Sequence, residues 1–419
     1  MTRFENVIGY EDIKRELRPI CDMIANSEPY RAVHAHVPHG LLLYGQPGVG
    51  KTLMATALME ESGRPYYILR RDRPKDEFLA ELRRIFTAAT ENEPAIILLD
   101  DMDKFPEGED SREEFATLQA CIDGLGSHEV FVLATANDVS EMPASLKRAG
   151  RFDRQIKVRL PKPEESEKII AHYLEGRAEL SALQNEDLAM MLTGKSCAEL
   201  ETLMNEASIR AGFRKAETVT FSDILEAFLS VPVGEDAFSA YPEIPDEVPW
   251  HEAGHLVMME LLNPGSAGFA ALGSSAGEDS AGFVIRHTLP STEEQEVMIS
   301  LAGKAACELE FGSAAGGTRS DIRRATEGIR SLMRSSGRGN YPVFNPNPRL
   351  SNSDSWRFEE ETRLRSEMER LLIEARKLLA KNRDFLCKTA QALQARKYIL
   401  HSEIQVIRDS CAIIPPEAA

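Results

Sequence analysis

The sequence predicts an α/β domain on a largely parallel sheet, then a small helical domain, and then a third, mainly helical domain. Three observations support this prediction. From residue 1 to about 162, short and continuously apolar runs alternate with helical stretches, as is typical of strands covered on both faces. Helical periodicity replaces the strand pattern over 163–231. Prolines then break any helix within 232–249, a predicted linker to the third domain at 250–412.

Apolar runs predict four strands of the α/β domain, at 40–44, 65–69, 95–99 and 130–134. The first run leads into a glycine-rich stretch, and residues 51–61 beyond that stretch are predicted to be helical. Because the runs are apolar throughout rather than at alternate positions, helices are expected on both faces of the sheet.

In the third domain, two clusters rich in small residues, 273–277 and 312–317, predict loops. From Phe358 onward, apolar residues recur at the i, i+4, i+7 and i+8 spacings of an amphipathic helix. A long helix is therefore predicted in this part of the chain.

The composition excludes several classes of protein. A formal net charge of −18 disfavours nucleic acid as a partner, because a polyanion binder needs basic residues to replace counterions. The six cysteines are scattered without a C-x-x-C pair, so neither a disulfide framework nor a cysteine zinc site is expected. No apolar run approaches the ~18–20 residues of a membrane helix, and the polar start does not resemble a signal peptide. The sequence thus predicts a cytoplasmic protein.

The segment Gly45-Gln46-Pro47-Gly48-Val49-Gly50-Lys51-Thr52 fits the G-x-x-x-x-G-K-[ST] phosphate-binding loop. Between a buried strand and a helix, such a loop leaves backbone N–H groups free to bind phosphate oxygens. Lys51 is expected to reach the β- and γ-phosphates of ATP, and Thr52 is expected to ligate Mg²⁺. All residues of this loop are therefore candidate nucleotide-binding residues.

Two carboxylates, Asp100 and Asp101, follow the apolar run at 95–99. Doubly wound sheets place their ligands at this carboxyl edge of the strands. Asp100 is expected to hold Mg²⁺, and Asp101 to lie where a base can polarise the attacking water. A solvated strand end is the alternative, and the phosphate loop upstream favours the nucleotide site.

A second motif, His251-Glu252-Ala253-Gly254-His255, fits the H-E-x-x-H pattern of zinc peptidases. Residues four apart share a helix face, so His251 and His255 can bind one Zn²⁺ ion. Glu252 is then placed to take a proton from water. An ordinary amphipathic helix is the alternative explanation, and the linker and nucleotide motif upstream favour the zinc site.

Together the two motifs resemble the AAA+ zinc metalloproteases of the FtsH type, over nearly the whole chain. The resemblance implies an AAA+ nucleotide-binding domain at 1–162, its helical lid at 163–231 and a zinc-metallopeptidase domain at 250–412. It also implies the family's homohexameric ring. The membrane anchor that usually precedes the ATPase core in this family is not visible in this sequence.

Further roles in the nucleotide site are implied by the resemblance. In the stretch R-A-G-R-F-D-R at 148–154, Arg148 and Arg151 match the arginine fingers that reach a neighbouring subunit's nucleotide. Asn137 matches the family's sensor residue, which helps to position the attacking water. Ile8 and Gly9 are placed near the adenine by the same resemblance.

A third zinc ligand is also implied by the resemblance, because the family has an aspartate in a downstream stretch that ends N-D-[IL]-x-x-A-T. Residues 317–326 read G-T-R-S-D-I-R-R-A-T, so Asp321 is the implied ligand, although Arg319 and Ser320 depart from the usual residues. Glu308 and Glu310 are competing candidates, but periodicity around them favours a solvated helix face.

Two departures from the family concern the ATPase. After the second strand the family carries an aromatic-apolar-glycine loop that grips substrate, whereas residues 70–77 here are charged and lack glycine. Phe78 is the nearest aromatic residue, and its spacing with later apolar residues predicts a helix core position. Asp101 stands where the family usually has glutamate, so slower ATP hydrolysis is expected.

The resemblance implies an ATP-dependent zinc endopeptidase that unfolds and degrades unfolded or tagged proteins, with Zn²⁺ and ATP–Mg²⁺ as cofactors. Two other functions stay open. One is a metallopeptidase whose ATPase domain regulates assembly without threading substrate, and the other is a remodelling ring without proteolysis. A location at the cytoplasmic face of a membrane is the alternative to the cytoplasm if an anchor or a partner is missing from this chain.

Overall fold

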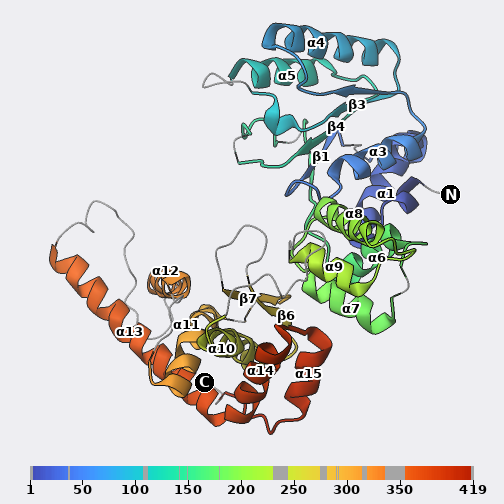
Figure 1. Cartoon of the computed structure of the whole chain (residues 1–419). Helices are drawn as coiled ribbons and strands as arrows, with labels where there is room; N and C mark the ends of the chain where they lie inside the picture. Colours follow the sequence, from blue (N-terminus) through green and yellow to red (C-terminus); the bar gives the residue numbers. More distant parts are fainter. Residues whose placement is uncertain are drawn as a thin grey trace. The chain divides into compact units, whose positions relative to one another are not determined.

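The computed structural model describes residues 3–35, 38–106, 112–140, 142–148, 150–178, 180–229, 244–273, 281–288, 290, 292–313, 319–335 and 354–416. The chain forms two compact units (Figure 1). Unit 1 comprises Met1–Tyr173 and Gly194–Thr202, and unit 2 comprises Leu174–Thr193 and Leu203–Ala419.

Unit 1 is built on a five-stranded parallel sheet with the strand order β2-β3-β4-β1-β5. The strands are β1 (Gly40–Tyr44), β2 (Tyr66–Leu69), β3 (Ala95–Leu99), β4 (Val130–Ala136) and β5 (Arg154–Lys157). The predicted parallel α/β class is confirmed. Strand β5 was missed by sequence reasoning, because three of its four residues are exposed and it carries no apolar run.

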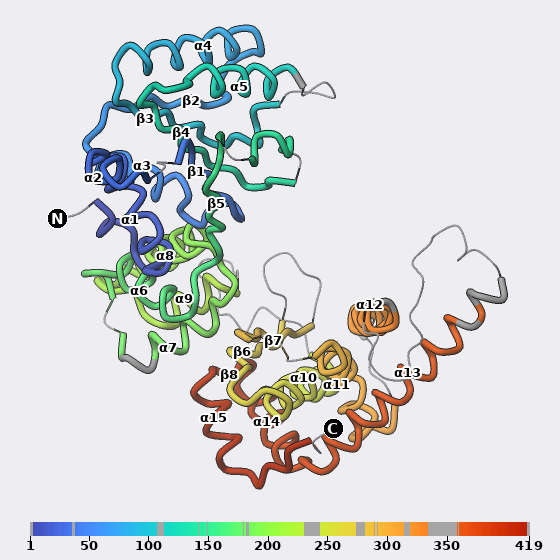
Figure 2. The backbone as a smooth tube through the Cα atoms, turned by 180° about the vertical axis from the view of Figure 1, so that it is seen from behind, coloured from blue at the N-terminus to red at the C-terminus, as the bar shows by residue number. Residues whose placement is uncertain are grey.

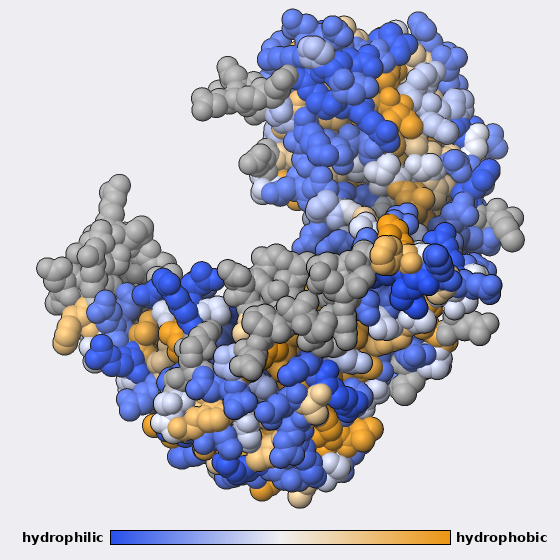
Figure 3. All heavy atoms as spheres, viewed as in Figure 1, coloured by the Kyte–Doolittle hydropathy of each residue, from blue (hydrophilic) through white to orange (hydrophobic). Residues whose placement is uncertain are grey.

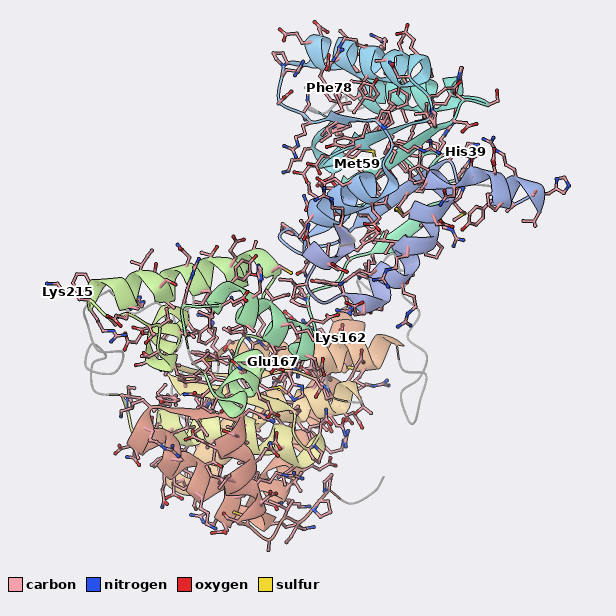
Figure 4. All side chains as sticks on the ribbon, turned by 90° about the vertical axis from the view of Figure 1, so that its right-hand side faces the viewer. His39, Met59, Phe78, Lys162, Glu167 and Lys215 are labelled. Carbon is pink, nitrogen blue, oxygen red and sulfur yellow. The ribbon has the colours of Figure 1, made fainter. Side chains whose placement is uncertain are left out.

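Helices cover both faces of this sheet, as the continuous apolar runs predicted. One face carries α4 (Lys75–Glu91) and α5 (Arg112–Gly124), and the other carries α1 (Glu11–Ala25) and α3 (Lys51–Ser62), as Figures 1 and 2 show. Phe78 on α4 and Met59 on α3 lie on opposite sides of the sheet in Figure 4, and both are fully buried. The outer surface of α4 and α5 is mostly hydrophilic in Figure 3.

Four helices follow the sheet, and the described residues of 163–229 contain no strand. They are α6 (Pro163–Leu174), α7 (Ala182–Met191), α8 (Cys197–Phe213) and α9 (Phe221–Phe228). Capping boxes start α7 at Ser181 and α9 at Thr220. Helix α8 runs from unit 1 into unit 2, whereas α7 and α9 belong to unit 2. The division into three domains at the expected boundaries stays a prediction.

Unit 2 is mainly helical, with a small antiparallel sheet of order β7-β6-β8. Its strands are β6 (Ala267–Leu272), β7 (Gly282–Arg286) and β8 (Tyr398–Leu400). Its further helices are α10 (Glu247–Leu262), α11 (Glu293–Phe311), α12 (Arg319–Ser335), α13 (Asp354–Lys381), α14 (Arg383–Arg396) and α15 (His401–Asp409). The remaining short elements of the chain are η1 (Arg3–Asn6), α2 (Ser27–Ala32) and η2 (Met102–Lys104).

Some predicted features of unit 2 differ in extent from the observed elements. Helix α10 begins at Glu247, so the last residues of the predicted linker are helical, including Pro249. A proline is tolerated in a first helical turn, because its missing N–H has no partner there in any helix. The long helix predicted from Phe358 is α13. Most of the two predicted loops, at 274–277 and 314–317, lies outside the described residues.

The core of unit 2 is formed where α10 packs against α11 (Figures 1 and 2). Small residues allow a close approach of the two helices. A Cβ added at Gly254 would lie 2.5 Å from the Ala302 carbonyl oxygen and 2.7 Å from the Ala306 Cβ. Among the described residues, no helix is long and apolar enough to cross a membrane.

Candidate functional site

The glycine loop connects β1 to α3 in unit 1, where the motif predicted it. Gly45 has φ +152° and lies against the Val158 carbonyl oxygen, which an added Cβ would approach to 2.0 Å. Gly50 precedes α3 with φ +92°, and no side chain caps this helix. The first N–H groups of α3 are thus left uncapped, as a phosphate-binding helix N-terminus requires. Gln46, Pro47 and Gly48 are exposed in the loop, and Val49 is buried beneath it.

Lys51 folds back over the loop that precedes it. Its Nζ donates to the carbonyl oxygens of Gly45 and Gln46, both at 2.9 Å, and to Oδ1 of Asn137 at 2.8 Å. Burial lowers the pKa of Lys51, and the nearby carboxylates of Asp101, Asp103 and Asp100 oppose this shift. The structure therefore brings the candidate phosphate lysine and the candidate sensor residue into direct contact.

Asp100 lies at the carboxyl edge of β3 and is buried. Its Oδ1 accepts hydrogen bonds from Thr52 Oγ1 and Thr135 Oγ1, each at 2.8 Å. Its Oδ2 accepts from Arg70 Nε at 2.9 Å. The two candidate Mg²⁺ residues, Thr52 and Asp100, are thus adjacent. Thr135 and Arg70 were missed by sequence reasoning; a polar residue inside the apolar run of β4 was the available signal for Thr135.

Asp101 lies beside this cluster in a left-handed backbone conformation, with φ 56°. Its backbone N–H donates to Thr135 Oγ1 at 2.8 Å, which ties it to the Asp100 network. Its Oδ2 accepts from Lys104 Nζ at 2.6 Å. Asn137 is held from a different side, because its backbone N–H and its Nδ2 donate to the carboxylate of Asp103 at 3.0 and 3.2 Å.

Ile8 and Gly9 precede α1, and their surroundings link them to the phosphate loop through α8. The next residue, Tyr10, contacts Cys197 Sγ through its hydroxyl at 3.4 Å. The N–H of Ala198, one residue further along α8, donates to the Gly48 carbonyl oxygen at 3.0 Å. Gly9 is buried and Ile8 is half-buried. These contacts are made by Tyr10 and α8 and not by Ile8 or Gly9, so the adenine role of these two residues stays a prediction.

The two candidate arginine fingers differ in their surroundings. Arg151 binds Asp123 through Nε and Nη2, both at 2.8 Å, and donates from Nη1 to the Ser145 carbonyl oxygen at 2.6 Å. Arg148 is exposed, and within the described residues its guanidinium has no ion-pair partner. Arg148 is therefore free to reach outward, whereas Arg151 is engaged within its own chain.

Three side chains in unit 2 converge to form a candidate metal centre. Asp321, in the first turn of α12, lies 70 residues from His251, yet its Oδ2 is 3.0 Å from His251 Nε2 and 3.4 Å from His255 Nε2. The two Nε2 atoms are 3.1 Å apart. Donor atoms around a tetrahedral Zn²⁺ with bonds of ~2.1 Å are separated by about 3.4 Å. The observed triangle therefore fits a zinc ion.

Outer contacts orient these ligands. The Nδ1–H of His255 donates to the Ile299 carbonyl oxygen at 2.7 Å, so its Nε2 carries a lone pair toward the cluster. An added Cβ at Gly303 on α11 would lie 2.6 Å from His255 Nε2, so only glycine leaves room there. His251 Nδ1 is buried without a hydrogen-bond partner among the described residues. No sequence signal could identify Ile299, because its backbone carbonyl oxygen, and not its side chain, accepts this hydrogen bond.

Two opposing influences act on the Asp321 carboxylate. Burial disfavours its charged form, but the adjacent imidazoles of His251 and His255 outweigh burial and hold the pKa of Asp321 well below its usual range. Asp321 therefore faces the two histidines as an anion, which is the form that binds a metal.

Glu252 is buried beside this triangle. Burial raises the pKa of Glu252 to about 7, while the charge of His251 opposes the shift. Gly282 on β7 packs against it, since an added Cβ would lie 2.6 Å from Glu252 Cγ. The competing ligands predicted from sequence lie elsewhere: Glu308 pairs with Lys304 and Arg376, and Glu310 pairs with Arg383.

Comparisons with known proteins agree with both clusters. Residues 41–160 match the family model of the ATPase family associated with various cellular activities (AAA). A protein of Symbiobacterium thermophilum named ATP-dependent zinc metalloprotease FtsH 2 is 31% identical, over 96% of this chain and 74% of the relative. Relatives from Leptotrichia buccalis and Petrotoga mobilis, named ATP-dependent zinc metalloprotease FtsH and FtsH 2, are 32% and 30% identical over 80% and 79% of this chain.

The fold and the two clusters define a AAA ATPase domain joined to a metallopeptidase domain of the H-E-x-x-H type. The chain belongs to the FtsH family of ATP-dependent zinc metalloproteases. It spans 46% and 56% of the lengths of the Leptotrichia and Petrotoga relatives, that is, about half.

Proposed function

We propose that this chain is an ATP-dependent zinc endopeptidase that unfolds and degrades proteins as a homohexameric ring. The observation that carries the proposal is the triangle of His251, His255 and Asp321 beside Glu252, in a chain that also has the Lys51–Asn137 and Thr52–Asp100 contacts of a nucleotide site. Unfolded or tagged polypeptides would be the substrates, and nucleic acid has no role.

In the peptidase site, His251, His255 and Asp321 would hold Zn²⁺, which supplies a Lewis acid that polarises water and the scissile carbonyl group. Glu252 acts as the general base that accepts a proton from the attacking water and then donates it to the leaving amine nitrogen. Burial raises the pKa of Glu252 above its ordinary value, which favours acceptance of the proton. The Ile299 carbonyl keeps His255 in the tautomer that presents Nε2.

In the nucleotide site, the loop from Gly45 to Thr52 would bind the phosphates of ATP–Mg²⁺, and hydrolysis of the terminal phosphoanhydride by water would supply the free energy for unfolding. Lys51 would exchange its bonds to the loop carbonyls for bonds to phosphate oxygens, and Thr52 and Asp100 would hold Mg²⁺. Asn137 and Asp101 orient the attacking water. Arg148 reaches the nucleotide of the neighbouring subunit, and Ile8 and Gly9 lie near the adenine.

One observation favours a second function, a metallopeptidase whose ATPase domain regulates assembly without threading substrate. Residues 70–77 contain no glycine or aromatic residue, and Phe78, the nearest aromatic, is fully buried with Arg71 over its ring at 4.7 Å. The substrate-gripping loop of the family therefore has no counterpart in this described segment.

The test measures zinc content and the cleavage of an unfolded protein and of a short peptide, each with and without ATP. The proposal expects ATP to be required for the unfolded protein and not for the peptide. Equal cleavage of both substrates without ATP would support the regulatory alternative. ATPase activity without zinc or cleavage would instead indicate a remodelling ring.

Two variants test the peptidase site and the nucleotide site independently of each other. Glu252→Gln should abolish cleavage and leave zinc content and ATPase activity unchanged, because the amide cannot accept the proton. Lys51→Ala should abolish ATP hydrolysis and keep peptide cleavage. Residual proteolysis in Glu252→Gln would reject the assigned base.

The cytoplasmic location also belongs to this proposal. All six cysteines lie within the described residues, and none of them forms a disulfide. Thiols at these scattered positions are compatible with a reducing compartment. Fractionation of cells that produce the full chain would test the location, including attachment to the cytoplasmic face of a membrane.

A further inference from the structure

The candidate metal-binding carboxylate of the nucleotide site is held by three groups of its own chain. Asp100 receives two hydroxyl donors at Oδ1, from Thr52 and Thr135, and the guanidinium of Arg70 at Oδ2. Its side chain is 8% exposed. A carboxylate buried to this extent needs a compensating charge. Among the described residues, Arg70 is the cation within ion-pair distance of Asp100.

Arg70 is suited to a contact that can be broken. Its side chain is 58% exposed, so the guanidinium can move into solvent without loss of packing. Lys51 does not compete for this carboxylate, because its Nζ binds two loop carbonyls and Asn137. The charge that neutralises Asp100 therefore comes from an exposed side chain rather than from the phosphate loop.

A Mg²⁺ ion brought by ATP to Thr52 and Asp100 would meet this arginine. The metal needs the same carboxylate, and two cations next to one carboxylate repel each other strongly where water is partly excluded. The metal and the Arg70 guanidinium therefore compete for Asp100. When ATP and Mg²⁺ bind, either the metal or the Arg70 guanidinium must therefore leave Asp100.

Arg70 also begins the segment that joins β2 to α4. The preceding residue, Leu69, is tied to the same aspartate, since its carbonyl oxygen accepts from the Asp100 N–H at 3.0 Å. The carbonyl oxygen of Arg70 accepts from the Asp72 N–H at 3.1 Å. Release of the guanidinium thus removes a side-chain contact that holds this turn at the nucleotide site.

We propose that Arg70 is a resident cation that neutralises Asp100 in the nucleotide-free protein, and that Mg²⁺ bound with ATP displaces it. Once displaced, the Arg70 side chain no longer ties the segment 70–74 to Asp100, so this segment responds to the binding of nucleotide. This inference rests on the proposed ATP site and adds a positioning residue to it.

The experiment measures binding of a fluorescent, non-hydrolysable ATP analogue to the full chain as Mg²⁺ is titrated. Arg70→Gln should lower the Mg²⁺ concentration at half-maximal binding by roughly three- to tenfold, because the competing charge is removed. Arg70→Lys, which keeps the charge, should behave like the wild type. Arg73→Gln is the matched control in the same segment, since Arg73 pairs with Asp72 and Glu81 instead.

Thermal unfolding gives a second readout that does not depend on activity. Nucleotide-free Arg70→Gln should unfold at a lower temperature than the wild type, and saturating Mg²⁺ and analogue should remove the difference. An unchanged Mg²⁺ midpoint in Arg70→Gln, or a higher one, would overturn the inference. Failure of the wild type to bind the analogue at any Mg²⁺ concentration would instead overturn the proposed ATP site.

Discussion

Asp321 is the residue on which the proposed zinc site depends most, because it comes from a helix 70 residues beyond His251. We predict that Asp321→Asn lowers zinc affinity by roughly tenfold or more, since a neutral amide is a poor zinc ligand. Glu308→Gln is the matched control: Glu308 was a competing ligand from sequence, but it pairs with Lys304 and Arg376. Zinc analysis of both purified variants checks the prediction, and zinc loss in Glu308→Gln alone would contradict it.

At the scale of elements, the metal site depends on how closely α10 and α11 approach. We predict that Gly254→Ala destabilises the protein by about 1–3 kcal/mol, because the new methyl group would meet the backbone of Ala302 at 2.5 Å and cannot be accommodated by a side-chain shift. Gly212→Ala is the control, since it lies in helix α8 with open space around its Cβ position. Denaturant unfolding of both variants provides the measurement, and equal stability would show that the helices can separate at no cost.

At the scale of the whole molecule, the nucleotide site is proposed to be completed by a neighbouring subunit. We predict that Arg148→Ala lowers ATP turnover on the order of 10³-fold with nucleotide affinity preserved, because the arginine acts on the transition state. Mixing it with Lys51→Ala, which has an intact Arg148 but a defective phosphate loop, should restore part of the activity. Steady-state ATPase assays of each variant and of the mixture test this, and a mixture no more active than its parts would argue against a shared site.

Arg151 serves as the comparison in the same experiment. Its guanidinium group binds Asp123 and the Ser145 carbonyl oxygen of the same chain. Arg151→Ala should therefore lower the stability of the fold as well as ATP turnover. Complementation by Lys51→Ala should therefore be weaker for Arg151→Ala than for Arg148→Ala. The two arginines were indistinguishable in the sequence motif, and only their surroundings separate them.

Several features could be predicted because they depend on local sequence. The runs that became β1, β3 and β4 are apolar throughout, since helices cover both faces of the sheet. The glycine loop and the pair His251 and His255 follow from short-range geometry, as do the helical core positions of Phe78 and its neighbours. Strand β5 and the sheet of unit 2 escaped prediction, because their pairing partners, and not their composition, make them strands.

The sequence by itself determined the two motifs and the class of the fold, because these depend on residue type and spacing, and the resemblance to the FtsH family added Asp321 as a candidate ligand. Only the tertiary structure decided which distant groups meet them: Asp321 beside the histidines, Ile299 behind His255, and Arg70 on Asp100. Contacts between residues far apart in the chain depend on how helices and strands pack, and a carbonyl oxygen or a surface arginine carries no local signal of its partner. The sequence was therefore enough to locate both sites, whereas the groups that surround them could be identified only in the folded structure.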